Sequence, residues 1–176
     1  MFILVTGGSG SGKSAYAESR VSSLQTEEKY YIATMQVYGE EGRKKVLRHQ
    51  QMRADRGFET IERQRDIHLA LAQMHTPEKA CVLVECMSNL LANEMFTEQE
   101  ILDEDTIADK VTAEMKQLIV QTGHQVVVTN NVFEDGEIYG EGTMAYMRAL
   151  GQVNRSLAKL ADEVVESVVG IPVRVK

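Results

Sequence analysis

Residues 7–14 read Gly7-Gly8-Ser9-Gly10-Ser11-Gly12-Lys13-Ser14, the glycine-rich pattern ending in Lys-Ser that binds nucleotide phosphates. The pattern forms a phosphate site when a strand precedes it and a helix follows it. Here the apolar run 2–5 precedes it, and the amphipathic stretch 14–24 follows it. The alternative is a Gly/Ser-rich turn that ends in Lys-Ser by chance, which leaves this order of elements unexplained. We therefore predict a nucleotide-phosphate site at residues 7–14.

The residue types in this loop match the needs of a phosphate group. Glycines let the backbone turn tightly and point successive N–H groups at one anion, and the following helix adds the partial positive charge of its N-terminus. Lys13 is expected to reach the β- and γ-phosphates, and the Ser14 hydroxyl is expected to hold Mg²⁺. The loop thus predicts a bound nucleoside triphosphate with Mg²⁺.

Composition limits the other possibilities. The chain has 176 residues, which suits one α/β domain over 1–176, and its net charge of −7 argues against broad nucleic-acid binding. No apolar stretch approaches the roughly 20 residues that span a bilayer, and the first residues lack a signal-peptide pattern. Cys81 and Cys86 flank an apolar run and are interpreted as buried thiols rather than a disulfide. We expect a cytoplasmic protein.

Short apolar runs alternate with longer amphipathic stretches along the chain. The runs 2–5, 29–34, 81–85 and 125–129 are continuous, as is typical of strands buried on both faces of a parallel sheet. Candidate helices lie near 40–56, 65–75, 87–95, 98–122 and 142–162. The last runs, 164–169 and 171–175, meet at Gly170 and suggest a hairpin at a sheet edge. The pattern predicts an α/β fold with a mainly parallel sheet flanked by helices.

Glu85 ends the apolar run 81–85. In an open α/β sheet the carboxyl end of a strand lies beside the ligand crevice, so this carboxylate could bind Mg²⁺ directly or through water. The alternative is a solvated acidic residue at the end of a strand. The phosphate loop independently requires an acidic partner, which favours the metal or nucleotide role.

His49 lies in a basic segment of an otherwise acidic protein. If the segment is helical, Lys45, His49 and Arg53 share one face. Like charges disfavour protonation of the imidazole and leave it neutral and nucleophilic, so His49 could attack a phosphorus atom. A solvated basic helix is the alternative that spacing alone leaves open.

Taken together, these motifs resemble the bifunctional adenosylcobinamide kinase / adenosylcobinamide-phosphate guanylyltransferase family. The likeness runs in order through the residues 2–14, 31–34, 48–49, 58–62, 83–86, 90–93, 128–130, 151–154, 157–158, 161–164 and 170–172. It therefore spans essentially the whole chain. The phosphate loop alone is common, whereas its combination with the basic histidine segment and the C-terminal Ala161-Asp162-Glu163-Val164 and Gly170-Ile171-Pro172 is specific.

The resemblance implies a P-loop NTPase fold of the RecA-like type and a two-step enzyme. The first step would phosphorylate adenosylcobinamide with ATP or GTP, and the second would transfer GMP from GTP to that phosphate. His49 matches the histidine that carries GMP covalently in this family. The nucleotide positions that carry over are Gly7 to Ser14, Ala33, Thr34, Met35, Gln50, Gln51, Met52, Arg53, Glu62 and Glu85. The family is typically trimeric, which implies a homo-oligomer.

The chain departs from the family pattern after His49. Arg53-Ala54, Phe58 and Asn131 stand where many relatives have Arg-Pro, Trp and an acidic residue. These departures concern the cobinamide side rather than the nucleotide chemistry. Two other functions remain open from the sequence, namely a small-molecule kinase without guanylyl transfer and a non-catalytic GTP-binding regulator.

Overall fold

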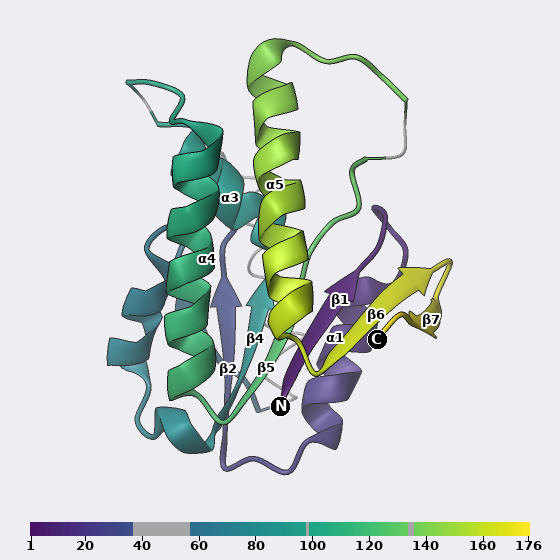
Figure 1. Cartoon of the computed structure of the whole chain (residues 1–176). Helices are drawn as coiled ribbons and strands as arrows, with labels where there is room; N and C mark the ends of the chain where they lie inside the picture. Colours follow the sequence, from purple (N-terminus) through teal and green to yellow (C-terminus); the bar gives the residue numbers. More distant parts are fainter. Residues whose placement is uncertain (37–56, 98, 134–135) are drawn as a thin grey trace.

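The computed structural model describes residues 1–36, 57–97, 99–133 and 136–176, which contain a seven-stranded sheet (Figure 1). The strands are β1 (Phe2–Thr6), β2 (Glu28–Ala33), β3 (Glu59–Glu62), β4 (Ala80–Glu85), β5 (His124–Val128), β6 (Glu163–Val168) and β7 (Ile171–Arg174). Their order is β3-β2-β4-β5-β1-β6-β7, and every neighbouring pair is parallel except the antiparallel β6 and β7. The mainly parallel sheet and the C-terminal edge hairpin are thus confirmed.

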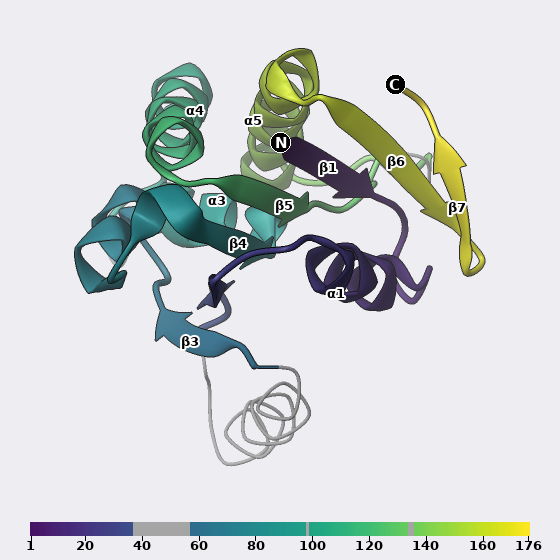
Figure 2. The same ribbon diagram turned by 90° about the horizontal axis from the view of Figure 1, so that it is seen from below.

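Helices cover both faces of this sheet, as Figure 2 shows. The helices are α1 (Lys13–Ser23), α3 (Met87–Met95), α4 (Glu104–Gln121) and α5 (Glu141–Leu160), with the 3₁₀ helices η1 (Ile67–Gln73) and η2 (Pro77–Lys79). Helix α1 lies on one face, and α3, α4 and α5 lie on the other. None of the helices in the described part of the chain combines the length and the apolar character that crossing a membrane requires.

The apolar core is divided by the sheet into two clusters. Along β1, Phe2 and Leu4 pack in the cluster under α3, α4 and α5, whereas Ile3 and Val5 pack in the cluster under α1. Side chains alternate between the faces of a strand, so a strand covered on both faces must be apolar at every position. Each buried aliphatic side chain contributes about 1.5–3 kcal/mol, which explains the continuous apolar runs.

Two of the predicted helices differ from their observed form. The stretch 65–75 contains a 3₁₀ helix, Ile67–Gln73, rather than an α-helix. Helix α4 begins at Glu104 rather than near residue 98, because Asp103 caps it by accepting a hydrogen bond from the Thr106 N–H at 2.9 Å. The apolar residues of α4 that recur every three or four positions, Ile107, Val111, Met115 and Leu118, are buried. The candidate helix near 40–56 lies outside the described residues.

The edge strand β3 was missed by the sequence reasoning. Only Ile61 of its residues is buried, so the segment lacks the continuous apolar run of the inner strands. It pairs in parallel with β2, with Ile61 opposite Ile32 and Glu62 opposite Ala33. An edge strand with one partner and one buried side chain leaves little hydrophobic signal.

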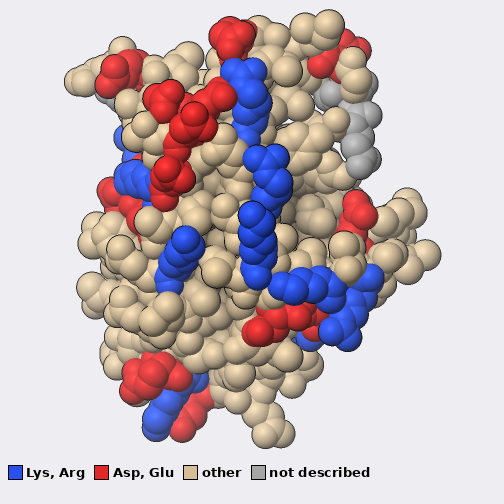
Figure 3. Space-filling view, in the orientation of Figure 1, with Lys and Arg blue, Asp and Glu red and all other residues tan. Residues whose placement is uncertain are grey.

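On the outer face of α4 and α5, Lys and Arg side chains form a column that runs beside a group of Asp and Glu side chains (Figure 3). Arg148 illustrates this arrangement, because its guanidinium lies 2.8 Å from a carboxylate oxygen of Glu104 and 2.9 Å from one of Glu141. Exposed pairs of this kind contribute little to stability. They do join the first turn of α4 to α5.

Candidate nucleotide-binding site

The phosphate loop connects the end of β1 to the first turn of α1. Gly12 precedes the helix with φ of 88°, a left-handed conformation that side chains disfavour. At Gly7 a Cβ atom would lie 2.6 Å from both the Ser11 hydroxyl and the Ser167 carbonyl oxygen, so only glycine fits there. The described first turn of α1 contains no acidic residue. Its positive end is therefore available to an anion.

The C-terminal hairpin supports this loop from outside. The Ser11 carbonyl oxygen accepts hydrogen bonds from the Ser167 hydroxyl at 2.6 Å and from the Gly170 N–H at 2.8 Å. A Cβ on Gly12 would lie 3.3 Å from the Gly170 Cα. The turn between β6 and β7 is thus part of the structure that shapes the loop. Sequence reasoning placed the hairpin at a sheet edge but did not connect it with the loop.

The Lys13 side chain folds back against the phosphate loop. Its side chain is buried, and its Nζ donates a 2.9 Å hydrogen bond to the Gly8 carbonyl oxygen. The bond holds the ammonium group over the loop backbone. A cation fixed at this place is positioned for an anion bound by the loop N–H groups.

Ser14 and Glu85 are brought into contact. The Ser14 hydroxyl donates a hydrogen bond to Oε1 of Glu85, and the Tyr31 hydroxyl donates one of 2.7 Å to Oε2. Strand β5 lies between β1 and β4, so the contact bridges a neighbouring strand. One carboxylate and one hydroxyl at a helix N-terminus are hard oxygen donors of the kind that Mg²⁺ prefers, so these residues fit that ion. Tyr31 was missed, because nothing in a buried strand marks a tyrosine as a partner of Glu85.

Ala33 is the last residue of β2, and Thr34 and Met35 follow it. The Thr34 hydroxyl donates to the Cys86 carbonyl oxygen at 2.9 Å and accepts from the Cys86 N–H at 2.6 Å. Thr34 also accepts from the Asn93 amide at 2.7 Å through its carbonyl oxygen. Its polar groups therefore hold β2 against the segment that leads into α3.

Glu62 ends β3 beside Ala33 and is exposed at the same edge of the sheet. The next residue, Arg63, donates its N–H to the Ala33 carbonyl oxygen at 2.9 Å. The carboxyl ends of β1, β2, β3 and β4 thus place Ser14, Ala33, Glu62 and Glu85 along one edge of the sheet, which is the ligand side of such folds. His49 and the stretch Gln50, Gln51, Met52 and Arg53 lie outside the described residues.

The segment after β5 also borders the phosphate loop. The Asn131 N–H donates to the Gly7 carbonyl oxygen at 3.0 Å, and the Asn130 amide donates to the Ser88 hydroxyl at 2.6 Å. Thr129 is fully buried, and its hydroxyl donates to Oδ1 of Asn154 at 2.7 Å. These hydrogen bonds hold the segment 129–131 between α5, α3 and the phosphate loop.

The sequence of this chain matches a known protein family. Residues 3–175 match the family described as cobinamide kinase / cobinamide phosphate guanyltransferase. The chain is similar to two proteins named bifunctional adenosylcobalamin biosynthesis protein CobU, from Escherichia coli (strain K12) and Salmonella typhimurium (strain LT2). It is 30% identical to each of them over 185 aligned residues, and the match covers 100% of this chain and 100% of each relative.

Solved structures show the fold. One of them, described as an ATPase domain, matches with a TM-score of 0.55 and 12% identity, over 94% of this chain and 68% of that chain. The flagellar accessory protein FlaH from Methanocaldococcus jannaschii matches with a TM-score of 0.51 and 13% identity, over 99% of this chain and 77% of that chain. These likenesses and the strand order show the P-loop NTPase fold of the RecA-like type.

Proposed function

Because the chain belongs to the cobinamide kinase / cobinamide phosphate guanyltransferase family, it is an enzyme of cobalamin biosynthesis, and we propose two successive reactions for it. It phosphorylates adenosylcobinamide with ATP or GTP, and it then transfers GMP from GTP to adenosylcobinamide phosphate. The product is adenosylcobinamide-GDP. The observation that carries the proposal is the contact of Ser14 with Glu85 at the end of a phosphate loop. Both reactions require bound triphosphate with a divalent ion at this place.

In the kinase step, the hydroxyl oxygen of the substrate attacks the γ-phosphorus and the nucleoside diphosphate leaves. The loop N–H groups and Lys13 bind the phosphates and stabilise the charge that develops on them. Ser14 and Glu85 would hold Mg²⁺, which supplies charge neutralisation at the phosphates. The protein contributes position and charge, and the reaction needs no covalent intermediate on the enzyme.

In the second step, we assign the nucleophile to His49. A ring nitrogen attacks the α-phosphorus of GTP, the bond to the β-phosphate oxygen breaks, and pyrophosphate leaves. A phosphate oxygen of the acceptor then displaces the histidine and forms the new P–O–P bond. The family match supports this assignment, together with the cations at Lys45 and Arg53 in the same segment. We assign Ala33, Met35, Gln50 to Arg53 and Glu62 to the nucleotide as well.

The test is covalent labelling with GTP that carries ³²P at the α-phosphate. The wild-type protein should acquire a label that is acid-labile and base-stable, as a phosphoramidate is. His49→Asn should lose the label and retain measurable kinase turnover. The matched control is His75→Asn, at an exposed position before η2, which should label as the wild type does.

Two results would contradict the proposal. Equal loss of both activities in a folded His49→Asn protein would show that His49 is not a nucleophile used only in guanylyl transfer. A wild-type protein that binds GTP but takes up no label would be a small-molecule kinase or, without any turnover, a non-catalytic GTP-binding regulator.

We also propose that residues 1–176 act as one cytoplasmic nucleotide-binding domain and assemble as a homo-oligomer. Both cysteines are unpaired, as is typical of proteins in a reducing compartment. The edge strand β7 exposes Ile171 and Val173, which supports an apolar subunit contact. Analytical ultracentrifugation would measure the assembly, and a trimer is the expected result.

A further inference from the structure

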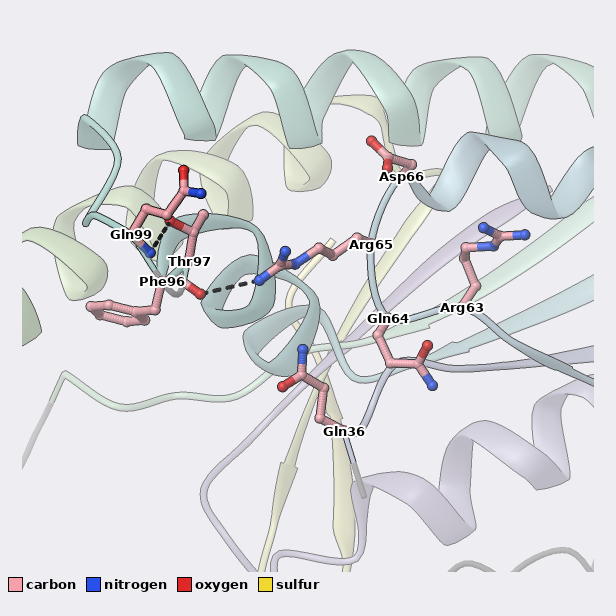
Figure 4. Close-up of a pocket in the computed structure, with 8 residues that line it drawn as sticks. All are labelled: Gln36, Arg63, Gln64, Arg65, Asp66, Phe96, Thr97 and Gln99. Carbon is pink, nitrogen blue, oxygen red and sulfur yellow. Dashed lines mark hydrogen bonds between the residues drawn. The ribbon is translucent and has the colours of Figure 1, made fainter. Parts of the chain in front are cut away.

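A polar pocket lies at the carboxyl edge of the sheet (Figure 4). Its volume is about 780 Å³, and its lining is Gln36, Arg63, Gln64, Arg65, Asp66, Phe96, Thr97 and Gln99. These residues follow β2, β3 and α3 in the chain. In the strand order, β2 lies three positions from β1, or roughly 14 Å at about 4.8 Å per strand.

The pocket carries a positive charge that its acidic residue does not cancel. Arg63 and Arg65 both line it, and Asp66 is the one acidic side chain among its described residues. Asp66 is already paired, because Lys110 Nζ lies 2.9 Å from its Oδ1. The hydrogen bond from Lys110 lowers the pKa of Asp66, which keeps the carboxylate ionised and bound to that lysine. Asp66 therefore does not neutralise Arg63 or Arg65, whose guanidinium groups extend to different sides of the segment 63–66 (Figure 4).

Arg65 is fixed in place by the end of α3. Its Nε donates to the Asn93 carbonyl oxygen at 2.6 Å. Its Nη2 donates to the Phe96 carbonyl oxygen at 3.2 Å, the bond that Figure 4 draws. Carbonyl groups at a helix C-terminus attract a cation, so these bonds hold the guanidinium rigidly. Within the described residues they use two of its five N–H donors. The group is preorganised for an anion or a carbonyl oxygen in the pocket.

Arg63 supplies an independent observation that points to a ligand. Its Nε is buried and has no hydrogen-bond partner among the described residues. A buried donor on a charged group that is left unpaired destabilises the folded state, so such donors usually have a partner in the working protein. Phosphate is well suited, because a guanidinium group binds it through two parallel hydrogen bonds.

We propose that this pocket binds the acceptor of guanylyl transfer, an amide-rich corrinoid that carries a phosphate monoester, with the phosphate held by Arg63. The inference rests on the function proposed above. The side-chain amides of Gln64 and Gln99 are complementary to the carboxamide groups of a corrinoid. The volume admits the phosphate-bearing arm and neighbouring amides rather than the whole macrocycle with its upper ligand. The nucleotide phosphates already have a separate loop, so a second phosphate site suits the second substrate.

The test compares the Arg63→Met protein with the wild type and with the control Arg155→Met, an exposed residue of α5 outside the pocket. Equilibrium dialysis measures the binding of cobinamide phosphate and of cobinamide, both of which are coloured. Arg63→Met should weaken binding of cobinamide phosphate by roughly tenfold or more, as expected for loss of a charge-assisted pair. Binding of cobinamide should change by less than about twofold, and covalent labelling by GTP should be unchanged, because both lack this phosphate contact. Arg63→Lys should restore part of the affinity.

Three results would overturn the inference. Unchanged affinity for cobinamide phosphate in a folded Arg63→Met protein would show that the pocket does not hold its phosphate. An equal loss of affinity for cobinamide, which has no phosphate, would show that Arg63 does not act through the phosphate. A parallel loss of GTP labelling would assign the pocket to the nucleotide. Failure of the proposed function is visible separately, since the wild-type protein would then neither bind cobinamide phosphate nor convert it.

Discussion

The Ser14 hydroxyl donates a hydrogen bond to Oε1 of Glu85, although the two residues are 71 positions apart in the chain. The contact joins the first turn of α1 to the carboxyl end of β4. It places a hydroxyl and a carboxylate where the loop would present the β- and γ-phosphates. Tyr31 fixes the second carboxylate oxygen at 2.7 Å, so the carboxylate has little freedom to rotate.

Glu85→Gln should lower both proposed activities by about 10²-fold or more, because it removes the negative charge that would hold Mg²⁺ while it retains the shape and an acceptor oxygen. Turnover measured against Mg²⁺ concentration should show a raised requirement for the ion. Tyr31→Phe is the matched control, since it removes one hydrogen bond and leaves the carboxylate. Turnover of Glu85→Gln within about threefold of wild type at every Mg²⁺ concentration would exclude a metal role.

Ser167→Ala should weaken nucleotide binding through the shape of the loop. The substitution removes the 2.6 Å hydrogen bond to the Ser11 carbonyl oxygen, which is worth about 1 kcal/mol. We expect a Kd for a fluorescent GTP analogue that is raised roughly fivefold, with a similar small loss in the free energy of unfolding. Ser22→Ala is the control, because that hydroxyl donates to the Glu18 carbonyl oxygen on the exposed side of α1. Equal affinities of the two variants for the GTP analogue would show that the hairpin does not affect nucleotide binding by the loop.

The sequence predicts the parts of this protein that depend on neighbours in the chain or on burial. The loop 7–14 follows its motif, and β4 follows from an apolar run covered on both faces. The contact of Ser167 with Ser11 depends on how β6 lies beside β1, which local patterns do not encode. The pocket at Arg63 and Arg65 was missed for the same reason, because it forms where the segment after β3 meets the end of α3.

Glu163→Gln should destabilise the fold at neutral pH, with an effect that shrinks in acid. Arg20 donates to both carboxylate oxygens of Glu163, at 2.6 and 2.9 Å, and these hydrogen bonds lower the pKa of Glu163. A lowered pKa contributes stability above the pKa of the unfolded chain, about 4.3, and that stability is lost as the pH falls through the folded value. We expect a loss of about 1–2 kcal/mol at pH 7 by urea denaturation.

The control for this pH dependence is Glu59→Gln, an exposed residue at the start of β3. It should change the free energy of unfolding by less than about 0.5 kcal/mol at any pH. A Glu163→Gln deficit that stays constant from pH 7 to about pH 3 would show that the Arg20 pair does not cause it.

Lys110→Met should be strongly destabilising, because Lys110 lies among three carboxylates. Its Nζ lies 2.9 Å from Asp66, 2.7 Å from Glu94 and 3.7 Å from Glu114. Glu94 and Glu114 are buried and also accept the N–H groups of Asp66 and Ile67, so they cannot leave without breaking the start of η1. Removal of one partner from a buried ionic group typically costs about 3–5 kcal/mol, and we expect the lower end here because Lys110 is partly exposed.

The pH dependence distinguishes this cause from lost packing. Burial raises the pKa of Glu114, and loss of the ammonium group removes the larger of the two interactions, with Lys110 and with His68, that oppose this rise. A raised pKa means that stability is lost as the pH rises through the folded value, so the Lys110→Met deficit should be largest at about pH 8 and smaller near pH 5. The matched control is Lys79→Met, whose exposed partner Glu27 lies 3.3 Å away, and it should cost less than about 1 kcal/mol. A deficit of equal size at both pH values would mean that the lysine acts through its aliphatic chain, since only the ionic role depends on ionised carboxylates.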